Sequence, residues 1–388
     1  MGRDVRIGVV LPRTGRLARL GDPLAYCGER LAPLLGGRGV RLEWRDSRSE
    51  PEPARRAVRE LAADPGVALV VTMAGTHMVP AVAAECRAAG VPCVSSTLPW
   101  QVYRAMSGDD GQWGAHFCWG LGDIGTVFAG LWRQVGPGVR VGCLWNDGPQ
   151  GDHLRSGDPT GFLAATAAQG FEVFDPGPYT EGAEDFTAQI TALREAGVSV
   201  VTSAATAADL GRFREQAAAA GFTPRLITSS RWLAYPEGVH PGGEQPAPRS
   251  ADDVATIVYW TPRHPYRSSL DDTTARSLAE DYGRDTGRSW LQPLGLAHGL
   301  MEVAAHALAA ADDPADRTSV AKALQATVLD TVAGHLDWRR GPAPGVARVP
   351  LAAGQWRRSD GERRLLMVGD GGLPGLPVDA PLAYLPGS

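Results

Sequence analysis

Short apolar segments alternate with segments of helical periodicity along this chain, and this alternation constrains its fold more than any other feature. Short apolar runs predict buried strands, at residues 5–11, 40–45, 67–72 and 92–95. The segments between them have helical spacing of apolar residues, at 24–35, 53–63 and 79–89. A repeated β-α-β pattern is typical of a parallel sheet with helices on both faces.

The pattern restarts after a glycine-rich segment at residues 120–125. Helices and strands are then predicted in turn, at 124–134, 140–145, 160–169, 171–174, 186–195, 198–203, 207–219 and 225–228. A Pro/Gly-rich loop follows at 236–248, and then a strand at 254–260. Three helices are predicted at 273–286, 293–310 and 318–325, and the final part, 341–388, is predicted to consist of strands and loops. A chain of 388 residues is long enough for two domains of about 150 residues each. We therefore predict an α/β fold with two doubly wound parallel sheets.

The composition argues against several partners and chemistries. The formal net charge is −5 and no block of like charge occurs, so nucleic acid is not an expected partner. Lys322 is the only lysine, which argues against a lysine Schiff base or a phosphate-loop lysine. The motifs G-x-S-x-G and H-E-x-x-H do not occur, and the eight histidines show no metal-binding spacing. We expect no catalytic residue, no metal and no cofactor.

The cysteines and the N-terminus bear on the compartment. The chain has five cysteines without C-x-x-C spacing, which predicts small buried side chains, with a bridge between Cys86 and Cys93 left open. No apolar run approaches the roughly 18 residues that a membrane span needs. The first ten residues enter a strand directly, without a signal-peptide pattern. The protein is therefore expected to be cytoplasmic, or extracellular or periplasmic after removal of a leader.

Hydroxyl side chains follow two neighbouring strands of the predicted sheet. The segment VSSTLPW places Ser95, Ser96 and Thr97 at the end of one strand, and Thr76 and His77 follow the strand before it. Ligands of open parallel sheets bind beyond the carboxyl ends of the strands, where loops and helix N-termini present backbone N–H groups. These loops are suited to a carboxylate or another polar head group. The alternative is that the hydroxyls cap helices or close turns.

Several stretches together resemble a known family. They are IGVVLPRTGRLARLGDPLAYCGERLA, a Gly-Thr loop after VALVVTMA, GVPCVSSTLP, VGCLWNDGPQG and YTEGAEDFTAQITALREAGVSVV. In order and spacing they are similar to the extracellular solute-binding proteins of ABC transporters, in the class that binds branched-chain amino acids. The resemblance covers almost the whole chain. It implies a type I periplasmic-binding-protein fold, in which two α/β lobes joined by three crossovers close on a small ligand.

The resemblance also implies which residues belong to each lobe and which bind the ligand. Lobe 1 would comprise residues 1–121 and 252–332, and lobe 2 residues 122–251 and 333–388. The positions that match the family's ligand-binding loops are Thr76, His77, Ser95, Ser96, Thr97, Gln150 and Thr206. At Gln150 and Thr206 this chain departs from the aromatic residues that relatives often have. Only weak candidates can be named for an acidic partner of a ligand ammonium group, Asp147 and Glu237.

Four tryptophans lie near predicted strand ends or a crossover, where an indole ring can stack on a ligand. They are Trp100, Trp119, Trp145 and Trp232. Core packing is the alternative for each. Hydroxyl groups with an aromatic wall suggest a carboxylated ligand with an apolar body, either an aromatic acid or a hydrophobic or branched-chain amino acid.

The sequence therefore predicts a non-catalytic, monomeric receptor that passes a small molecule to an ABC permease. The alternative is a cytoplasmic sensor with the same fold that regulates a partner protein. A hydrolase on a two-lobe scaffold is disfavoured because no nucleophile-base pair can be named.

Overall fold

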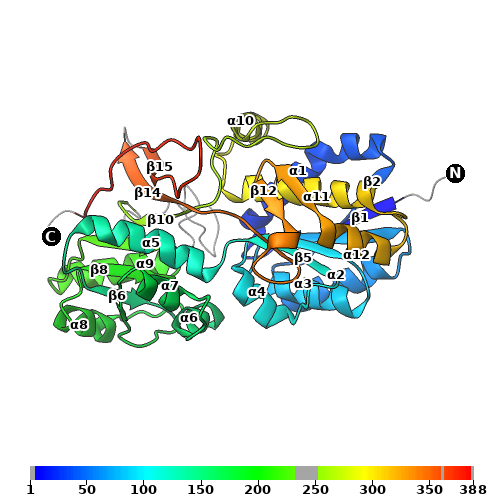
Figure 1. Ribbon diagram of the computed structural model, residues 1–388. Coiled ribbons are helices and arrows are strands. Elements are labelled where there is room, and N and C mark those ends of the chain that lie inside the picture. The colour runs from blue at the N-terminus through cyan, green and yellow to red at the C-terminus, as the bar shows by residue number, and fades with distance from the viewer. Residues whose placement is uncertain (1–4, 232–251, 360–361, 386–388) are drawn as a thin grey trace. The chain divides into compact units, whose positions relative to one another are not determined.

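The computed structural model describes residues 5–231, 252–359 and 362–385. The chain divides into two compact units. Unit 1 contains Met1–Trp119 and Trp260–Val349, and unit 2 contains Gly120–Tyr259 and Pro350–Ser388. Each unit is built around its own sheet (Figure 1), as the two stretches of β-α-β pattern predict.

Unit 1 has a six-stranded sheet in the order β13-β5-β4-β3-β1-β2. All of its paired neighbours are parallel. In chain order the strands are β1 (Val5–Leu11), β2 (Val40–Asp46), β3 (Val67–Met73), β4 (Cys93–Ser96), β5 (Gly114–Cys118) and β13 (Val346–Arg348). Every residue of β3 is buried, as is typical of a parallel strand covered by helices on both faces.

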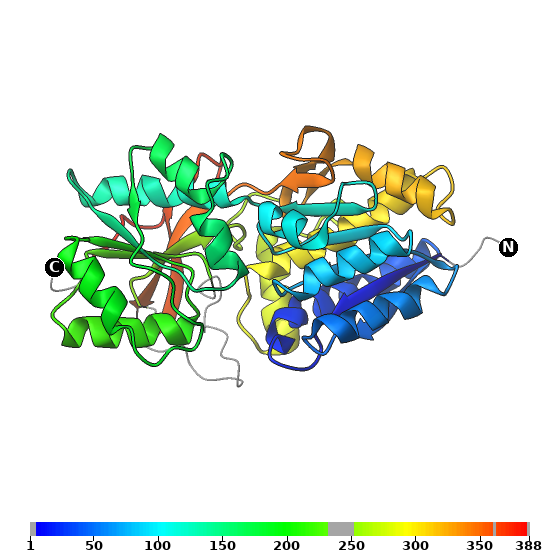
Figure 2. The same ribbon diagram turned by 90° about the horizontal axis from the view of Figure 1, so that it is seen from below.

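Helices cover both faces of this sheet (Figures 1 and 2). One side carries α1 (Ala18–Gly37), α11 (Pro293–Ala310) and α12 (Arg317–Ala326), and the other carries α2 (Pro51–Ala62) and α3 (Met78–Ala88). Unit 1 also contains α4 (Trp100–Ser107), α10 (Ala275–Thr286), the hairpin β11 (Val328–Thr331) and β12 (Gly334–Asp337), and the 3-10 turn η2 (Trp338–Arg340). Helix α11 is apolar on nearly all sides because it packs against both α1 and the sheet.

A fully buried carboxyl group on α11 holds two loops of unit 1. Glu302 Oε1 accepts hydrogen bonds from Ser269 N at 2.6 Å and Ser269 Oγ at 2.9 Å. Glu302 Oε2 accepts one from Val332 N, in the turn between β11 and β12, at 3.0 Å. Burial raises the pKa of Glu302 to about 7, outweighing these donors, which lower it.

Unit 2 has a seven-stranded sheet in the order β15-β14-β10-β9-β8-β6-β7. Its parallel strands are β6 (Val141–Leu144), β7 (Val173–Phe174), β8 (Val200–Ser203), β9 (Leu226–Ser229) and β10 (Ala255–Val258). The antiparallel strands β14 (Ala352–Ser359) and β15 (Glu362–Gly369) complete one edge. The helices are α5 (Leu121–Val135), α6 (Pro149–Arg155), α7 (Phe162–Ala168), α8 (Thr187–Glu195) and α9 (Ala207–Ala219).

The last two unit boundaries lie later in the chain than the sequence suggests. Residues 252–259, expected in the first lobe, contain β10, which pairs with β9 and β14 in the sheet of unit 2. Residues 333–349, expected in the second lobe, contain β13, which pairs with β5 in unit 1. Strand pairing decides both boundaries, and no local sequence pattern records which sheet a strand joins.

All five cysteines are free and buried, including Cys86 and Cys93. None of the helices in the described ranges is long and apolar enough to cross a membrane.

Candidate functional site

The loops that follow β3 and β4 are tied together at the carboxyl ends of these strands. Thr97 Oγ1 accepts a hydrogen bond from Ala74 N at 2.8 Å and donates one to Ser96 O at 2.6 Å. Ala74 and Thr97 both have left-handed backbones, with φ of 78° and 75°. Such a backbone costs a residue other than glycine about 1 kcal/mol or more. Strain of this kind is typical of functional loops, and here the hydrogen bonds of Thr97 hold it in place.

Beyond this bond, the loop after β3 presents several donors that are not used within the unit. The backbone N–H groups of Gly75, Thr76 and His77 have no acceptor among the described residues, and neither does the Thr76 hydroxyl. Thr76 is half-buried and His77 is exposed. Helix α3 begins at Met78, directly after these residues. A helix N-terminus attracts anions, so this loop favours a negatively charged group.

The hydroxyls of Ser95 and Ser96 are fully buried and bonded inside unit 1. Ser95 Oγ lies 2.9 Å from His116 Nδ1, and His116 Nε2 lies 2.7 Å from Leu98 O. A carbonyl only accepts, so Nε2 carries the ring proton and Ser95 donates to Nδ1. Ser96 Oγ donates to Phe117 O at 2.6 Å. Both serines therefore hold the end of β4 from inside unit 1. Their hydroxyls are not exposed to a ligand, although the sequence suggested them for that role.

His116 is a residue of this region that sequence reasoning missed. Its ring stacks on Tyr103 with centroids 4.0 Å apart, and Tyr103 OH donates to Asp109 Oδ2 at 2.7 Å. Burial lowers the pKa of His116 to about 4, so the ring is neutral at pH 7. A lone histidine in GAHFC carries no pattern that distinguishes it from an ordinary core residue, because its partners come from distant parts of the chain.

The loop after β1 packs against the same end of the sheet. Asp46, the last residue of β2, accepts hydrogen bonds from Arg13 N, Thr14 Oγ1 and Arg48 N at 2.9, 2.6 and 2.8 Å. Although burial opposes it, these donors lower the pKa of Asp46. A Cβ atom placed on Gly75, whose φ is 97°, would meet Leu17 Cδ1 at 2.8 Å. The left-handed backbone therefore favours glycine at position 75, and any larger residue would also have to displace the Leu17 side chain.

The tryptophans named from the sequence occupy different environments. Trp100, the first residue of α4, is half-buried, and its backbone N–H donates to Trp119 O at 3.1 Å. Trp119 is 6% exposed and Trp145 is 2% exposed. Trp145 packs edge-on against Phe162 with centroids 5.5 Å apart, so the core-packing alternative describes it. Trp100 alone among these three has substantial exposed surface beside the loops after β3 and β4.

In unit 2, the sequence-based candidates lie at helix starts. Gln150 is half-buried in the first turn of α6. Thr206 is the N-cap of α9, where its Oγ1 accepts a hydrogen bond from Asp209 N at 3.1 Å. Its hydroxyl thus caps α9 in this structure. Trp232 and Glu237 lie outside the described residues.

A polar cluster at the carboxyl ends of the strands in unit 2 was also missed. Glu181 pairs with Arg231, which follows β9, and accepts a hydrogen bond from Asn146 Nδ2 at 3.1 Å. Asn146 follows β6, and its Oδ1 is buried without a partner in the described part of the chain. Asp147, a weak sequence candidate, is exposed and accepts from Thr180 Oγ1 at 2.6 Å. In the sequence YTEGAEDF, Glu181 is indistinguishable from a solvated turn residue.

No group of three or more His, Cys, Asp and Glu side chains within the described ranges could hold a metal ion. At the strand ends of unit 1, the loop after β3 offers hydrogen-bond donors without an acidic side chain, which suits reversible binding of an organic anion.

Solved structures with this architecture come from several bacteria. A leucine-binding protein from Thermotoga maritima is 19% identical, with a TM-score of 0.72 over 93% of this chain and 97% of that protein. A solute-binding protein of an ABC transporter from Rhodopseudomonas palustris, in complex with 3,4-dihydroxybenzoic acid, is 16% identical, with a TM-score of 0.69 over 99% of both chains. Another from R. palustris, in complex with benzoate, is 16% identical, with a TM-score of 0.66 over 94% of this chain and 95% of that protein.

At these identities the likeness establishes the fold, which is that of type I periplasmic binding proteins. No sequence among the curated proteins matches this chain significantly. A family model described as periplasmic binding protein matches residues 4–362. This chain therefore belongs to the periplasmic binding protein family, a class of solute-binding receptors that are generally not enzymes.

Proposed function

We propose that this protein is a receptor that binds a small carboxylated molecule reversibly, with the carboxylate held by the loop after β3. The observation that carries the proposal is the run of unused donors at Gly75, Thr76 and His77, directly before α3. Consecutive backbone N–H groups at a helix start form a concave site for an anionic oxygen. Thr76 adds a hydroxyl donor to the same loop.

The charge of the surrounding loops supports this assignment. Residues 74–77 and 97–100 contain no acidic side chain. A carboxylate placed there would meet donors without a like charge in these loops, and hydrogen bonds to an ionised acceptor are stronger than neutral ones. The structurally similar proteins include binders of leucine, benzoate and 3,4-dihydroxybenzoic acid, whose ligands all carry a carboxyl group.

The half-buried ring of Trp100 supports an apolar or aromatic body for the ligand. Two ligand classes fit this description, an aromatic acid and a hydrophobic or branched-chain amino acid. They differ in the ammonium group, which calls for an acidic partner. The loops at 74–77 and 97–100 around the proposed carboxylate site contain no acidic side chain. We therefore favour the aromatic acid.

Catalysis is not part of the proposal. The Ser95–His116 pair resembles a nucleophile and a base, but both side chains are fully buried. His116 donates its single ring proton, on Nε2, to a backbone carbonyl, so no carboxylate orients it for proton transfer. A structural role for this pair agrees with a receptor that releases its ligand unchanged.

We further propose that the receptor acts outside the cytoplasm as a monomer and delivers its ligand to an ABC permease, as the names of the similar proteins suggest. The alternative is a cytoplasmic sensor with the same fold. Co-purification of the full chain with membranes that contain the permease would support transport, whereas regulation of a soluble partner by the ligand would support the sensor.

The function is tested by thermal-shift measurements with benzoate, 4-hydroxybenzoate, leucine, benzyl alcohol and glucose. A ligand present at 100 times its dissociation constant should stabilise the protein by about 2.7 kcal/mol. We expect this stabilisation from a carboxylate and not from benzyl alcohol, which has the same ring but no charge. Stabilisation by glucose alone would overturn the proposal. Mass spectrometry of molecules released from the purified protein identifies a ligand outside this panel.

A further inference from the structure

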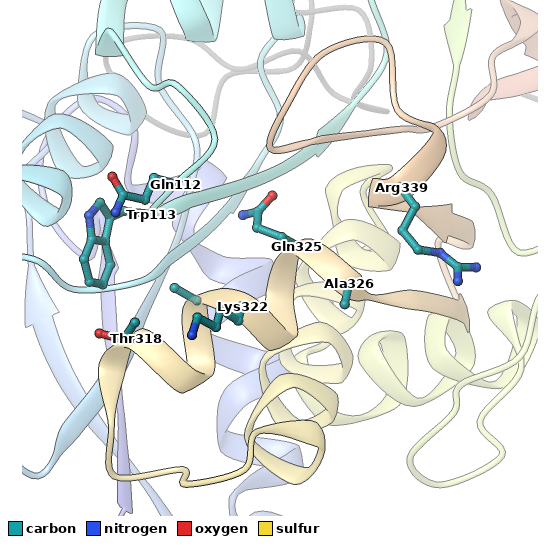
Figure 3. A pocket seen from close by; sticks show the side chains of 8 residues that line it. Gln112, Trp113, Thr318, Lys322, Gln325, Ala326 and Arg339 are labelled. Atoms are coloured by element: carbon teal, nitrogen blue, oxygen red, sulfur yellow. The ribbon is translucent and has the colours of Figure 1, made fainter.

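A cavity of about 480 Å³ lies on unit 1 between α12 and the segment that precedes β5. Its walls are formed by Gln112, Trp113, Thr318, Ala321, Lys322, Gln325, Ala326 and Arg339, and we call it the α12 groove. Figure 3 shows Trp113 on one side, Arg339 on the other, and Lys322 and Gln325 of α12 between them. Cavities of about 300 to 1,000 Å³ are typical of sites for small molecules.

The α12 groove is separate from the loops described above. Trp113 directly precedes β5 and therefore lies at the amino ends of the parallel strands. The loops at 74–77 and 97–100 follow β3 and β4 and lie at the carboxyl ends. Since the strands are parallel, the two places are at opposite edges of the same sheet.

The wall formed by α12 is firmly anchored. Arg317, its first residue, donates through Nε to Val67 O at 2.9 Å and through Nη2 to Asp64 O at 2.9 Å. Gln325 Nε2 donates to Gly114 O at 3.0 Å. The positions 318, 321, 322, 325 and 326 follow helical spacing, so one face of α12 borders the groove. A ligand would thus meet a preformed surface, which reduces the entropy cost of binding.

The charges around the α12 groove are positive. Lys322 and Arg339 line it, and no aspartate or glutamate does. Lys322 is exposed and has no ion-pair partner among the residues that the structure describes. Within the described ranges, the only ion-pair contact of the Arg339 guanidinium is with Asp337, at 3.6 Å. This surface is cationic in a chain of net charge −5.

We propose that the α12 groove is a second binding site, for a small anion with an apolar body such as an aromatic carboxylate. Lys322 would pair with the carboxylate, Trp113 and the two alanines would contact the ring, and Arg339 would add positive charge at the other end of the groove. The volume matches one small molecule, which favours this occupant over an acidic peptide. The proposal does not depend on the carboxylate site after β3.

The test uses the fact that Lys322 is the only lysine. Reductive methylation with ¹³C-formaldehyde keeps the charge and labels Lys322 and the N-terminal amine, which gives two signals in a ¹³C NMR spectrum of the full chain. Titration with benzoate should shift the Lys322 signal saturably and leave the N-terminal signal in place. Benzyl alcohol, without the carboxylate, should cause little shift. Loss of the positive charge of Arg339 in R339Q should weaken binding about three- to tenfold, and R340Q, at a neighbouring residue outside the groove, should not.

Three results would overturn the proposal: no shift of the Lys322 signal with benzoate, an equal shift with benzyl alcohol, or an equal effect of R339Q and R340Q. A shift with a glutamate-containing apolar peptide but not with benzoate would reassign the groove to a protein partner. T97A separates this site from the one after β3, since it should leave the Lys322 titration unchanged. A benzoate response at Lys322 that persists in T97A therefore supports the α12 groove as a binding site, whether or not the proposed receptor function is correct.

Discussion

Replacement of Thr97 tests how the strained loops at the ends of β3 and β4 are held. In T97A, Ala74 N loses its acceptor and the 2.8 Å hydrogen bond to Thr97 Oγ1 disappears. An unpaired, partly buried donor should lower the free energy of unfolding by about 1 to 2 kcal/mol. T97G loses the same bond, but glycine tolerates the φ of 75° and should recover about 1 kcal/mol of that loss. T97S keeps the hydroxyl and should match the wild type.

Urea unfolding measures these differences, and ligand titration measures their effect on binding. We expect the order of stability T97S, then T97G, then T97A. Because Thr97 orients the backbone that leads into Gly75–His77, T97A should weaken ligand binding about tenfold, equivalent to about 1.4 kcal/mol, whereas T97S should bind nearly as well as the wild type. The reasoning fails if T97A and T97S are equally stable, or if T97G is less stable than T97A.

The remaining predictions concern three other positions. G75A should destabilise the protein by about 1 to 3 kcal/mol and abolish ligand binding, because the added Cβ meets Leu17 and residue 75 has a φ of 97°. The matched change is G36A on α1, where the added Cβ enters open space. It should instead stabilise the protein by about 0.5 to 1 kcal/mol. The folded-state pKa of Glu302 is about 7 and its ordinary value is 4.5, so the folded state binds the proton more tightly and stability should fall as pH rises from 4.5 to 7, by on the order of 3 kcal/mol. E302Q should lack this slope in urea unfolding measured across that range, and a slope unchanged by E302Q would refute the assignment. Q150A should weaken binding of an aromatic acid without changing the unfolding midpoint, because Gln150 is half-buried in the first turn of α6, and equal affinity would remove Gln150 from the site.

Most strands and helices followed from local pattern. The segments 5–11 and 67–72 are mainly apolar, and they form β1 and β3; the shorter segment 225–228 precedes and overlaps β9. The elements missed were α4, β5 and α6, at 100–107, 114–118 and 149–155, and the hairpin β11–β12 with η2, at 328–340. Strand β5 reads GAHFC, in which glycine and histidine obscure the apolar pattern. Its strand character comes from pairing with β4 and β13, so only the assembled sheet defines it.

The sequence by itself determined that two α/β units form and that hydroxyl-rich loops follow two neighbouring strands of the first, because apolar periodicity and turn residues are local properties. Only the tertiary structure decided which of those groups remain free for a ligand. Ser95, Ser96 and Thr97 use their hydroxyl protons on His116, Phe117 and Ser96, while the backbone of Gly75–His77 keeps its donors. A hydroxyl bonds to whichever acceptor folding brings within about 3 Å. For the two serines, the acceptors lie on a different strand, β5, so only the folded structure shows which acceptor each hydroxyl uses.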